Sequence, residues 1–307
     1  MFTRLEDLPN ELIIEIFDYT KISDLSIAFW NLNQRFNQLI RSLQYLSLTL
    51  TKPDSYESTF FAEQIIRLVI VTLAPINLNR FINLRVLIIN WGYEYHLNEI
   101  RSEILPNLIY LSLPISFDYP SKHQLTSQIF TNRFTSLRYA DLGKIPMPIN
   151  STWSQSPSLR SLRIASLDIN IIPLILYSCP HLTHFEIRVY DENDFNCTSL
   201  PMIENHPLKQ FRFIQPQNSI FLFDISSILY ILPNLKQIDL QLCTRSFIDL
   251  IEFISKNIVN LNHFDCHIIE YPNENIHHNI KTLHQCYSSI QYTQREDHFR
   301  LYTTKKI

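Results

Sequence analysis

The sequence predicts a mixed α/β fold, in which a three-helix module is followed by a stacked solenoid of strand and helix repeats. Two observations lead to this prediction. Residues 8–40 carry apolar side chains at helical spacing. From residue 84 onward, an apolar strand pattern returns every 22 to 29 residues, as in a repeat protein. The chain has 307 residues, 46% of them hydrophobic and 18% charged, so it is long enough to bury a sizeable core.

The N-terminal segment is expected to form three short helices. Pro9 suits the first turn of the first helix, where its missing N–H group has no partner in any case. The apolar residues make one stripe on the first helix and cover most of the second: Leu12, Ile13, Ile16 and Phe17, then Leu25, Ile27, Phe29 and Trp30. A unit of roughly 40 residues buries too little surface to fold well alone. Its surplus apolar surface therefore indicates a docking face for another protein.

The same segment carries a recognisable pattern. It reads Leu8-Pro9-x-Glu11-Leu12-Ile13-x-x-Ile16-Phe17, then Asp24-Leu25, then Leu32-Asn33-x-Arg35-Phe36. From about Leu5 to Leu43 this pattern resembles the F-box, although Leu32, Asn33 and Phe36 stand where the commoner pattern has Val or Cys, a basic residue and Trp. That family's module binds the Skp adaptor of SCF-type cullin–RING ubiquitin ligases. The resemblance thus implies a Skp adaptor and a cullin scaffold as partners.

By the same resemblance, nine residues of the module are candidates for adaptor contact. They are Leu8, Pro9, Leu12, Ile16, Phe17, Leu25, Phe29, Leu32 and Phe36. Some of them must also hold the three helices together, and the sequence does not divide the two roles. A plainer alternative is that the helices only cap the following domain.

A core of Leu-x-x-apolar-x-apolar follows eight times, with spacing typical of leucine-rich repeats at about 20–29 residues. Its first residues are Leu84, Leu108, Leu137, Leu159, Leu182, Leu208, Leu235 and Leu261, with degenerate copies from Leu43 and Ile65. Each core predicts a strand, and the apolar stretches 169–177, 220–231 and 247–254 predict helices. Such units bury their faces only by stacking, so we expect an αβ solenoid with irregular repeats. The alternative is an ordinary α/β domain with coincidental leucine spacing.

These patterns divide the chain into an F-box-like module at residues 1–45, a repeat solenoid at 46–275 and a C-terminal cap at 276–307. Residues 51–64 are expected to form a joining loop. In the last segment, apolar residues flank the polar stretch 294–297 and predict a short hairpin that covers the last repeat: Ile290, Tyr292, Phe299 and Leu301.

The polar positions of the predicted strands face away from the core and are candidates for target contact. They are Tyr110, Arg138, Tyr139, Arg160, Arg163, His184, Lys209, Arg212 and Asp239. The five basic residues among them could form a cationic strip, with acidic residues concentrated toward the later repeats. Arg and Tyr are also favoured anchors of protein interfaces. The simpler alternative is that these residues are polar only because they are solvated.

Composition disfavours several kinds of chemistry. With only Gly92 and Gly143, the chain cannot assemble a phosphate-binding loop or a dinucleotide fingerprint. His263 and Cys266 make one metal-like pair, but no second pair follows at zinc spacing. We therefore expect no catalytic residues, metal or cofactor. A Cys–His nucleophile stays open, because such partners meet only in the fold.

Composition and sequence pattern also indicate the cellular location of the protein and disfavour some classes of partner. No apolar run approaches 18 residues, and the first residues lack the apolar run of a secretory signal. A net charge of −3 does not suit nucleic-acid binding, and five cysteines without a Cys-x-x-Cys pair suit reduced thiols. We expect a protein of the cytoplasm or nucleus, with neither a membrane nor a nucleic acid as partner.

Together these features predict a non-catalytic substrate-recognition subunit of an SCF ubiquitin ligase. The helical module would bind the Skp adaptor, and the repeats would recruit a target protein for ubiquitination. Two alternatives remain: a repeat scaffold that binds a protein outside any ligase, and an enzyme such as a hydrolase that uses one of the cysteines.

Overall fold

The computed structural model describes residues 4–52, 60–91, 94–115, 120–148, 153–190, 206–215, 225–271, 285–295 and 299–304. These residues contain eight α-helices and twelve β-strands, so the predicted mixed α/β class is confirmed. The chain divides into two compact units, Met1–Leu125 with Phe134–Leu137, and Thr126–Arg133 with Arg138–Ile307.

The first unit contains the N-terminal helices and four strands. The helices are α1 (Asn10–Asp18), α2 (Ile22–Ala28) and α3 (Gln34–Ser42), with α5 (Glu94–Glu99) further along. The strands are β1 (Leu46–Leu50), β2 (Ile65–Ile70), β3 (Val86–Ile89) and β4 (Tyr110–Ser112), which pair in parallel in that order. Turns of 3₁₀ helix lie at Leu5–Asp7, Ala62–Gln64 and Leu78–Arg80. Helix α6 (Pro120–Phe130) contributes residues to both units.

Aromatic packing and capping explain why the three N-terminal helices fold together. The rings of Phe17, Phe29 and Phe36 meet with centroids 5.0 to 6.0 Å apart, one ring from each helix or its end. Asn33 caps α3, because its side-chain oxygen accepts the N–H of Phe36 at 2.8 Å. The predicted three-helix module is therefore present, with Pro9 directly before α1.

The module packs against the first strands of the same unit through residues 60–64 of the expected joining loop. Gln64 donates from its side-chain amide to the carbonyls of Ile40 at 3.0 Å and Arg41 at 2.6 Å. These carbonyls lie in the last turn of α3, where Ile40 also accepts the N–H of Leu43 at 3.2 Å, so Gln64 adds to the cap of that helix. The ring of Trp30 lies against Phe60 at a centroid distance of 3.9 Å. The joining segment thus fixes the module to the strands.

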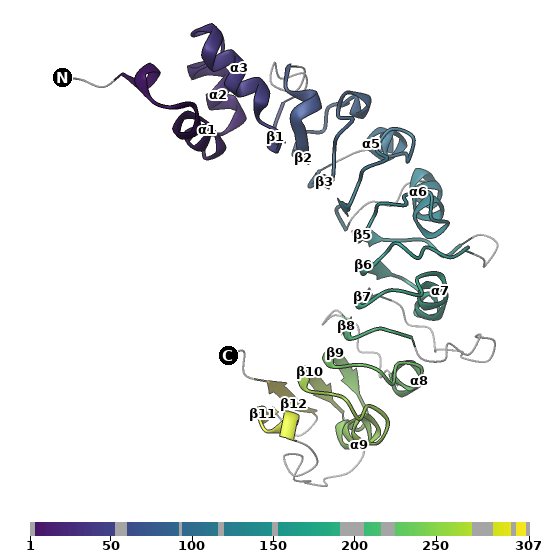
Figure 1. Cartoon of the computed structure of the whole chain (residues 1–307). Coiled ribbons are helices and arrows are strands. Elements are labelled where there is room, and N and C mark those ends of the chain that lie inside the picture. The colour runs from purple at the N-terminus through teal and green to yellow at the C-terminus, as the bar shows by residue number, and fades with distance from the viewer. Residues whose placement is uncertain are drawn as a thin grey trace. The chain divides into compact units, whose positions relative to one another are not determined.

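The second unit is built from six parallel strands with helices along one side (Figure 1). The strands are β5 (Tyr139–Lys144), β6 (Ser161–Ser166), β7 (His184–Val189), β8 (Gln210–Ile214), β9 (Gln237–Thr244) and β10 (His263–Glu270). The helices are α7 (Ile171–Ser178), α8 (Ser226–Tyr230) and α9 (Phe247–Asn257). Helix α8 lies within the predicted stretch 220–231. Helices α7 and α9 overlap the predicted stretches 169–177 and 247–254 and end slightly beyond them.

The repeat cores determine the register of these strands. Leu162 pairs with Phe185, and Phe185 with Phe211, each at the fourth position of its core. All three are buried, as are the first leucines of the described cores. A slip of one residue would turn every apolar side chain to the opposite face, so the leucine pattern specifies the pairing.

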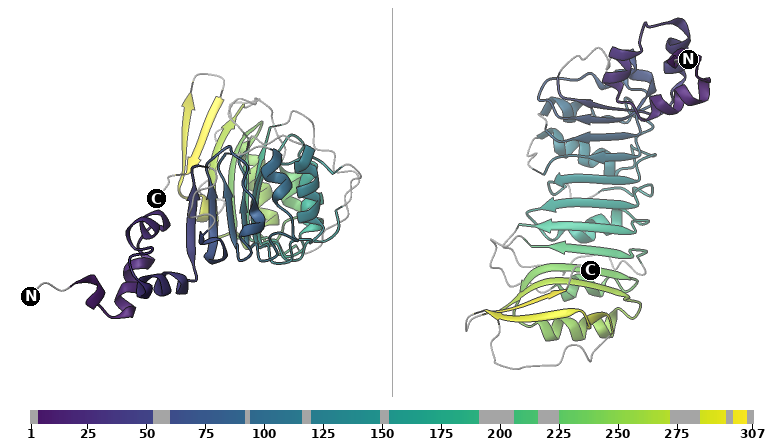
Figure 2. Two further views of the ribbon diagram at one scale, coloured as in Figure 1. Left: turned by 90° about the horizontal axis from the view of Figure 1, so that it is seen from above. Right: turned by 90° about the vertical axis from the view of Figure 1, so that its left-hand side faces the viewer.

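The predicted C-terminal hairpin is also confirmed (Figure 2). Strands β11 (Ile290–Arg295) and β12 (Phe299–Thr304) are antiparallel, and β12 pairs antiparallel with β10. A short 3₁₀ turn at Gln285–Tyr287 precedes them. The hairpin covers the edge of β10, which would otherwise present unpaired backbone groups.

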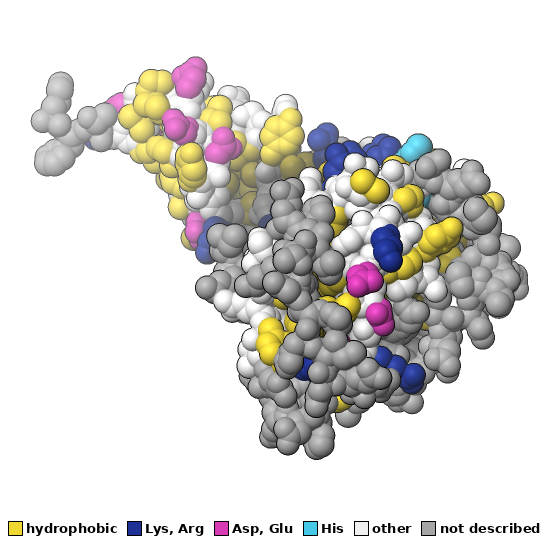
Figure 3. All heavy atoms as spheres, turned by 90° about the horizontal axis from the view of Figure 1, so that it is seen from below, with side chains coloured by type: hydrophobic (Ala, Val, Ile, Leu, Met, Phe, Trp, Pro, Cys, Tyr) yellow, Lys and Arg dark blue, Asp and Glu magenta, His cyan; other side chains and the backbone are white. Residues whose placement is uncertain are grey.

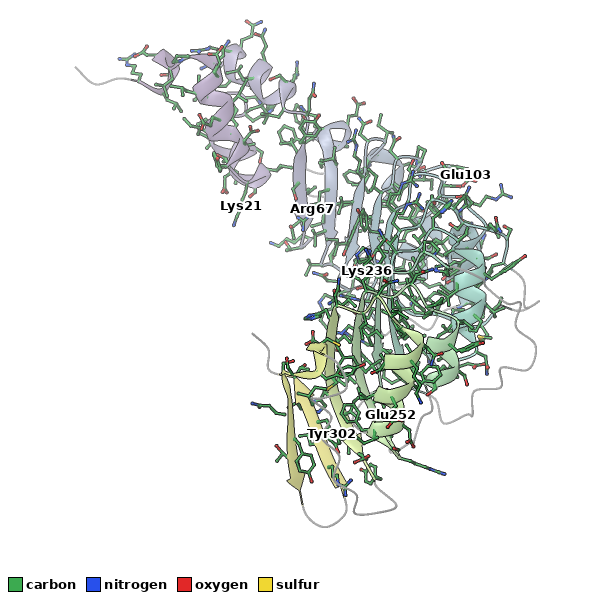
Figure 4. The ribbon with its side chains drawn as sticks, turned by 60° about the horizontal axis from the view of Figure 1, so that its bottom comes forward. Lys21, Arg67, Glu103, Lys236, Glu252 and Tyr302 are labelled. Atoms are coloured by element: carbon green, nitrogen blue, oxygen red, sulfur yellow. The ribbon has the colours of Figure 1, made fainter. Side chains whose placement is uncertain are left out.

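A buried charge cluster joins this hairpin to the last helix. Glu270 accepts the N–H of Phe247 at 2.9 Å, at the start of α9, and the hydroxyl of Tyr302 at 3.1 Å. Arg300 donates to the same carboxylate at 3.3 Å. Figure 4 labels Tyr302 on the hairpin and Glu252 on α9. This cluster could not be predicted from local sequence patterns, because its members are about 30 residues apart.

None of the helices in the described part of the chain is long and apolar enough to cross a bilayer.

Candidate protein-binding surfaces

The N-terminal helices expose large apolar side chains. Leu12 is 46% exposed, Ile16 38%, Ile27 82% and Leu32 55%. Leu12 and Ile16 lie one turn apart on the same side of α1. Figure 3 shows hydrophobic side chains gathered over these helices, with acidic side chains among them. We call Leu12, Ile16, Ile27 and Leu32 the apolar helix surface.

The structure divides the nine candidates for adaptor contact. Phe17, Leu25 and Phe36 are buried in the module itself, where they hold its helices together and are not part of its exposed surface. Leu8 and Phe29 are half-buried, whereas Pro9, Leu12, Ile16 and Leu32 are exposed. Ile27 was absent from the predicted set, yet it is the most exposed residue of the apolar helix surface. The sequence feature that could have indicated it is that apolar residues cover most sides of the second helix.

Arg35 holds the segment around Leu8 and Pro9 in place. Its guanidinium donates to the carbonyls of Glu6 and Leu8, and to the side-chain oxygen of Asn10 at 2.8 Å. These acceptors lie at the start of α1, so Arg35 ties α3 to the entry of α1. The motif residue Arg35 therefore has a structural role that the sequence pattern did not reveal.

In the second unit, charged residues of alternating sign form a row across the strands. Asp141, Arg163, Glu186, Arg212 and Asp239 are paired neighbours on β5 to β9. Arg163 lies 3.0 Å from Glu186 and 3.4 Å from Asp141. Arg212 lies 2.9 Å from Asp239 and 3.5 Å from Glu186. We call these five residues the charge ladder.

Glu186 is the centre of the charge ladder. A third arginine, Arg188, reaches its other oxygen at 3.5 Å. Burial raises the pKa of Asp141 at one end of the ladder, and the neighbouring Arg163 offsets this only in part. Next to the ladder runs a second polar row of Ser161, His184, Gln210 and Gln237, and this row lines a hollow of about 330 Å³ together with the four ladder residues from Arg163 to Asp239.

The charge ladder corrects the predicted cationic strip. Arg163 and Arg212 are neutralised by carboxylates on adjacent strands, so they are not a free positive surface. Arg160 and Lys209 directly precede Ser161 and Gln210, nearer the start of the strands, and form no ion pair with any described residue. Tyr139 is exposed, and Tyr110, half-buried, belongs to the first unit. The sequence showed each side chain but not which neighbours it would meet.

The thiols that the structure describes are not activated. Cys179, Cys243 and Cys266 are buried, and Cys286 is half-buried. Burial raises the pKa of Cys266 to about 12 and that of Cys286 to about 11. A cysteine nucleophile instead needs a lowered pKa. Cys197 lies outside the described residues. Within these residues no group of three His, Cys, Asp or Glu side chains could hold a metal ion.

His206 is a buried histidine just before β8. Its Nδ1 accepts the N–H of Leu208 at 3.2 Å, and its Nε2 donates to the carbonyl of Cys179 at 3.0 Å. This neutral tautomer uses both ring nitrogens. Burial lowers the pKa of His206, His181 adds to this effect, and backbone carbonyls oppose it.

We expect the free energy of unfolding to fall as the pH drops below about 6.5, the pKa of an unperturbed histidine. Below this pH His206 binds a proton more readily in the unfolded chain than in the folded chain, so protonation favours unfolding. Urea denaturation at about pH 7.5 and pH 5.5 measures the loss. A His206→Gln variant keeps a donor and an acceptor without titrating, and should lose less stability. An equal loss in both proteins would assign the effect to other groups, such as the buried His96.

Comparison with known proteins gave no identification: no protein-family model matches the chain, and no curated protein matches it significantly.

Proposed function

We propose that this protein is the substrate-recognition subunit of an SCF-type ubiquitin ligase. The observation that carries the proposal is the apolar helix surface, which stays exposed on a three-helix module with the Leu-Pro-x-Glu-Leu-Ile pattern of the F-box. Burying one such side chain stabilises a complex by roughly 1.5–3 kcal/mol. Four of them on a small module supply a driving force for binding a Skp adaptor.

The repeats would then recruit the target protein. The two rows of polar and charged side chains in the second unit support this role, because they offer an extended surface of side-chain donors and acceptors. Interfaces of this kind obtain specificity from charge complementarity. The chain would supply recognition in the cytoplasm or nucleus, and other subunits with the cullin scaffold would perform ubiquitin transfer.

The adaptor assignment is tested by a Leu12→Ser/Ile16→Ser variant. We expect the affinity for a recombinant Skp adaptor to fall by about tenfold or more, because two exposed apolar contacts are lost. Isothermal titration calorimetry measures the affinity, and a pull-down with adaptor and cullin measures assembly.

A matched control removes equally exposed apolar groups elsewhere. Tyr230 is 67% exposed and Val259 80% exposed in the second unit, so a Tyr230→Ser/Val259→Ser variant should bind the adaptor like the wild type. If the wild type itself fails to capture adaptor and cullin, the chain is instead a repeat scaffold outside any ligase. Unchanged affinity in the Leu12→Ser/Ile16→Ser variant would contradict the assignment of the apolar helix surface.

A further inference from the structure

Cationic residues line the edge at which the strands of the second unit begin. Arg138, Arg160, Thr183, Lys209 and Lys236 each occupy the position after the first leucine of a repeat core. Backbone hydrogen bonds link them in sequence: Arg160 N–H to Arg138, Thr183 to Arg160, Lys209 to Thr183 and Lys236 to Lys209, at 2.8 to 2.9 Å. These residues therefore lie side by side, and we call the row the strand-start row.

The described residues that lead directly into these strands contain no carboxylate. Residues 153–160, 179–183, 206–209, 231–236 and 258–262 include no Asp or Glu, whereas the acidic residues of the segment 191–205 lie outside the described residues. Acidic side chains of the described residues occur instead within the strands, as in the charge ladder, and beyond their other ends, as at Asp168 and Asp249. Among the described residues, the cations at the start of these strands are thus separated from the carboxylates.

The cations of this row differ from those of the charge ladder. Within the described residues, Arg160, Lys209 and Lys236 form no ion pair, whereas Arg163 and Arg212 do. Arg160 is held in place, because its guanidinium donates to the carbonyl of Pro157 at 2.6 Å. Arg138 likewise donates to the carbonyl of Ser158 at 3.1 Å. Arg160, Lys209 and Lys236 therefore offer positive charge that no carboxylate of the described residues neutralises.

The dimensions of the row match an extended peptide. Neighbouring strands lie about 4.8 Å apart, so the four steps from Arg138 to Lys236 span roughly 19 Å. An extended chain advances about 3.3 Å per residue and would cover this distance with about six residues. Directly beside the row, His184, Gln210 and Gln237 present side chains that can bind a peptide backbone.

We propose that the strand-start row binds an extended acidic segment of a partner protein, with Asp or Glu side chains paired to Arg160, Lys209 and Lys236. This inference rests on the proposed function in taking the partner of the repeats to be a protein. A single-stranded nucleic acid is the competing polyanion, and the test below includes it as an outcome that would overturn the inference.

Fluorescence anisotropy of the whole chain with a fluorescein-labelled hexaglutamate peptide at low ionic strength tests the proposal. We expect binding that weakens as salt is added. An Arg160→Gln/Lys209→Gln/Lys236→Gln variant should bind about tenfold more weakly, because three ion pairs are lost. A control variant, Arg67→Gln/Arg101→Gln/Arg245→Gln, removes the same charge from exposed residues that do not belong to the row and should bind like the wild type.

Three results would overturn the inference: equal binding of a hexaglutamine peptide, unchanged affinity in the strand-start variant, or tighter binding of a labelled oligothymidine of similar length. The strand-start variant should still be captured by the Skp adaptor, because its substitutions lie outside the N-terminal helices. Loss of peptide binding with adaptor capture intact, or the reverse, therefore separates failure of this inference from failure of the proposed function.

Discussion

A Phe36→Ala variant is expected to lose about 3–5 kcal/mol of stability in the N-terminal helices. Phe36 is fully buried and packs edge-on against Phe17 and Phe29. The truncation leaves a cavity in a module too small to relax around it, so α1 to α3 should open. Hydrogen exchange of residues 10–42 measures this opening, and adaptor binding should fall with it.

Two further variants separate stability from binding in this module. Tyr19 is 86% exposed, so Tyr19→Ala should change stability by less than about 0.5 kcal/mol. Ile27→Ala should likewise leave the fold intact but weaken adaptor binding, because Ile27 belongs to the apolar helix surface.

Hydrogen exchange in Phe36→Ala as slow as that of the wild type would contradict the first prediction. It would show that the rings of Phe17, Phe29 and Phe36 do not form the core of the module.

The second large effect is expected from Glu270→Ala, which removes the carboxylate that pairs with the buried guanidinium of Arg300. Breaking a buried ion pair in this way costs about 3–5 kcal/mol. The N–H of Phe247 and the hydroxyl of Tyr302 also lose their acceptor. The midpoint of urea unfolding should fall, and the amides of β12 should exchange faster, because the cluster joins the hairpin to α9.

Helix α9 provides a control that removes the same charge. Glu252 and Lys256 form an exposed pair at 4.0 Å on the helix surface, and Figure 4 labels Glu252 there. Glu252→Ala should change stability by less than about 0.5 kcal/mol, because exposed pairs one turn apart contribute little. If Glu270→Ala were as mild as Glu252→Ala, the buried cluster would not hold the hairpin.

The packing of the first unit has a consequence for the proposed function. Gln64 and Trp30 join the helical module to the first strands through hydrogen bonds and ring contacts. An adaptor bound to the apolar helix surface would therefore hold β1 and β2 in a defined position relative to itself. If a flexible linker without these contacts joined the helical module to β1 and β2, the bound adaptor would not hold these strands in a defined position.

The strands and the hairpin were predictable because their signals are local. Each repeat core carries its inward residues at alternate positions, as Leu162 and Ile164 do on β6, and both are buried. The hairpin from Ile290 followed from apolar residues on either side of a polar stretch. In both cases the pattern that predicts the element is contained in a few consecutive residues.

The charges were less predictable because their partners come from other strands. Arg163 and Arg160 are three residues apart, yet Glu186 neutralises the first, while the second forms no ion pair with any described residue. Likewise, Phe17 and Ile16 are adjacent in one apolar stripe, and only packing places Phe17 in the core and Ile16 at the surface. Spacing along the chain could not separate these roles.

The amino-acid pattern alone determined where the strands occur and which of their residues point inward, since periodic apolar side chains must all reach one core. It also located the N-terminal helices and α7 to α9, but not α5 and α6. The folded chain alone decided which apolar residues of the module remain uncovered and which cations pair with carboxylates of neighbouring strands. Exposure and ion pairing depend on neighbours brought together across tens of residues, and only the three-dimensional packing specifies those neighbours.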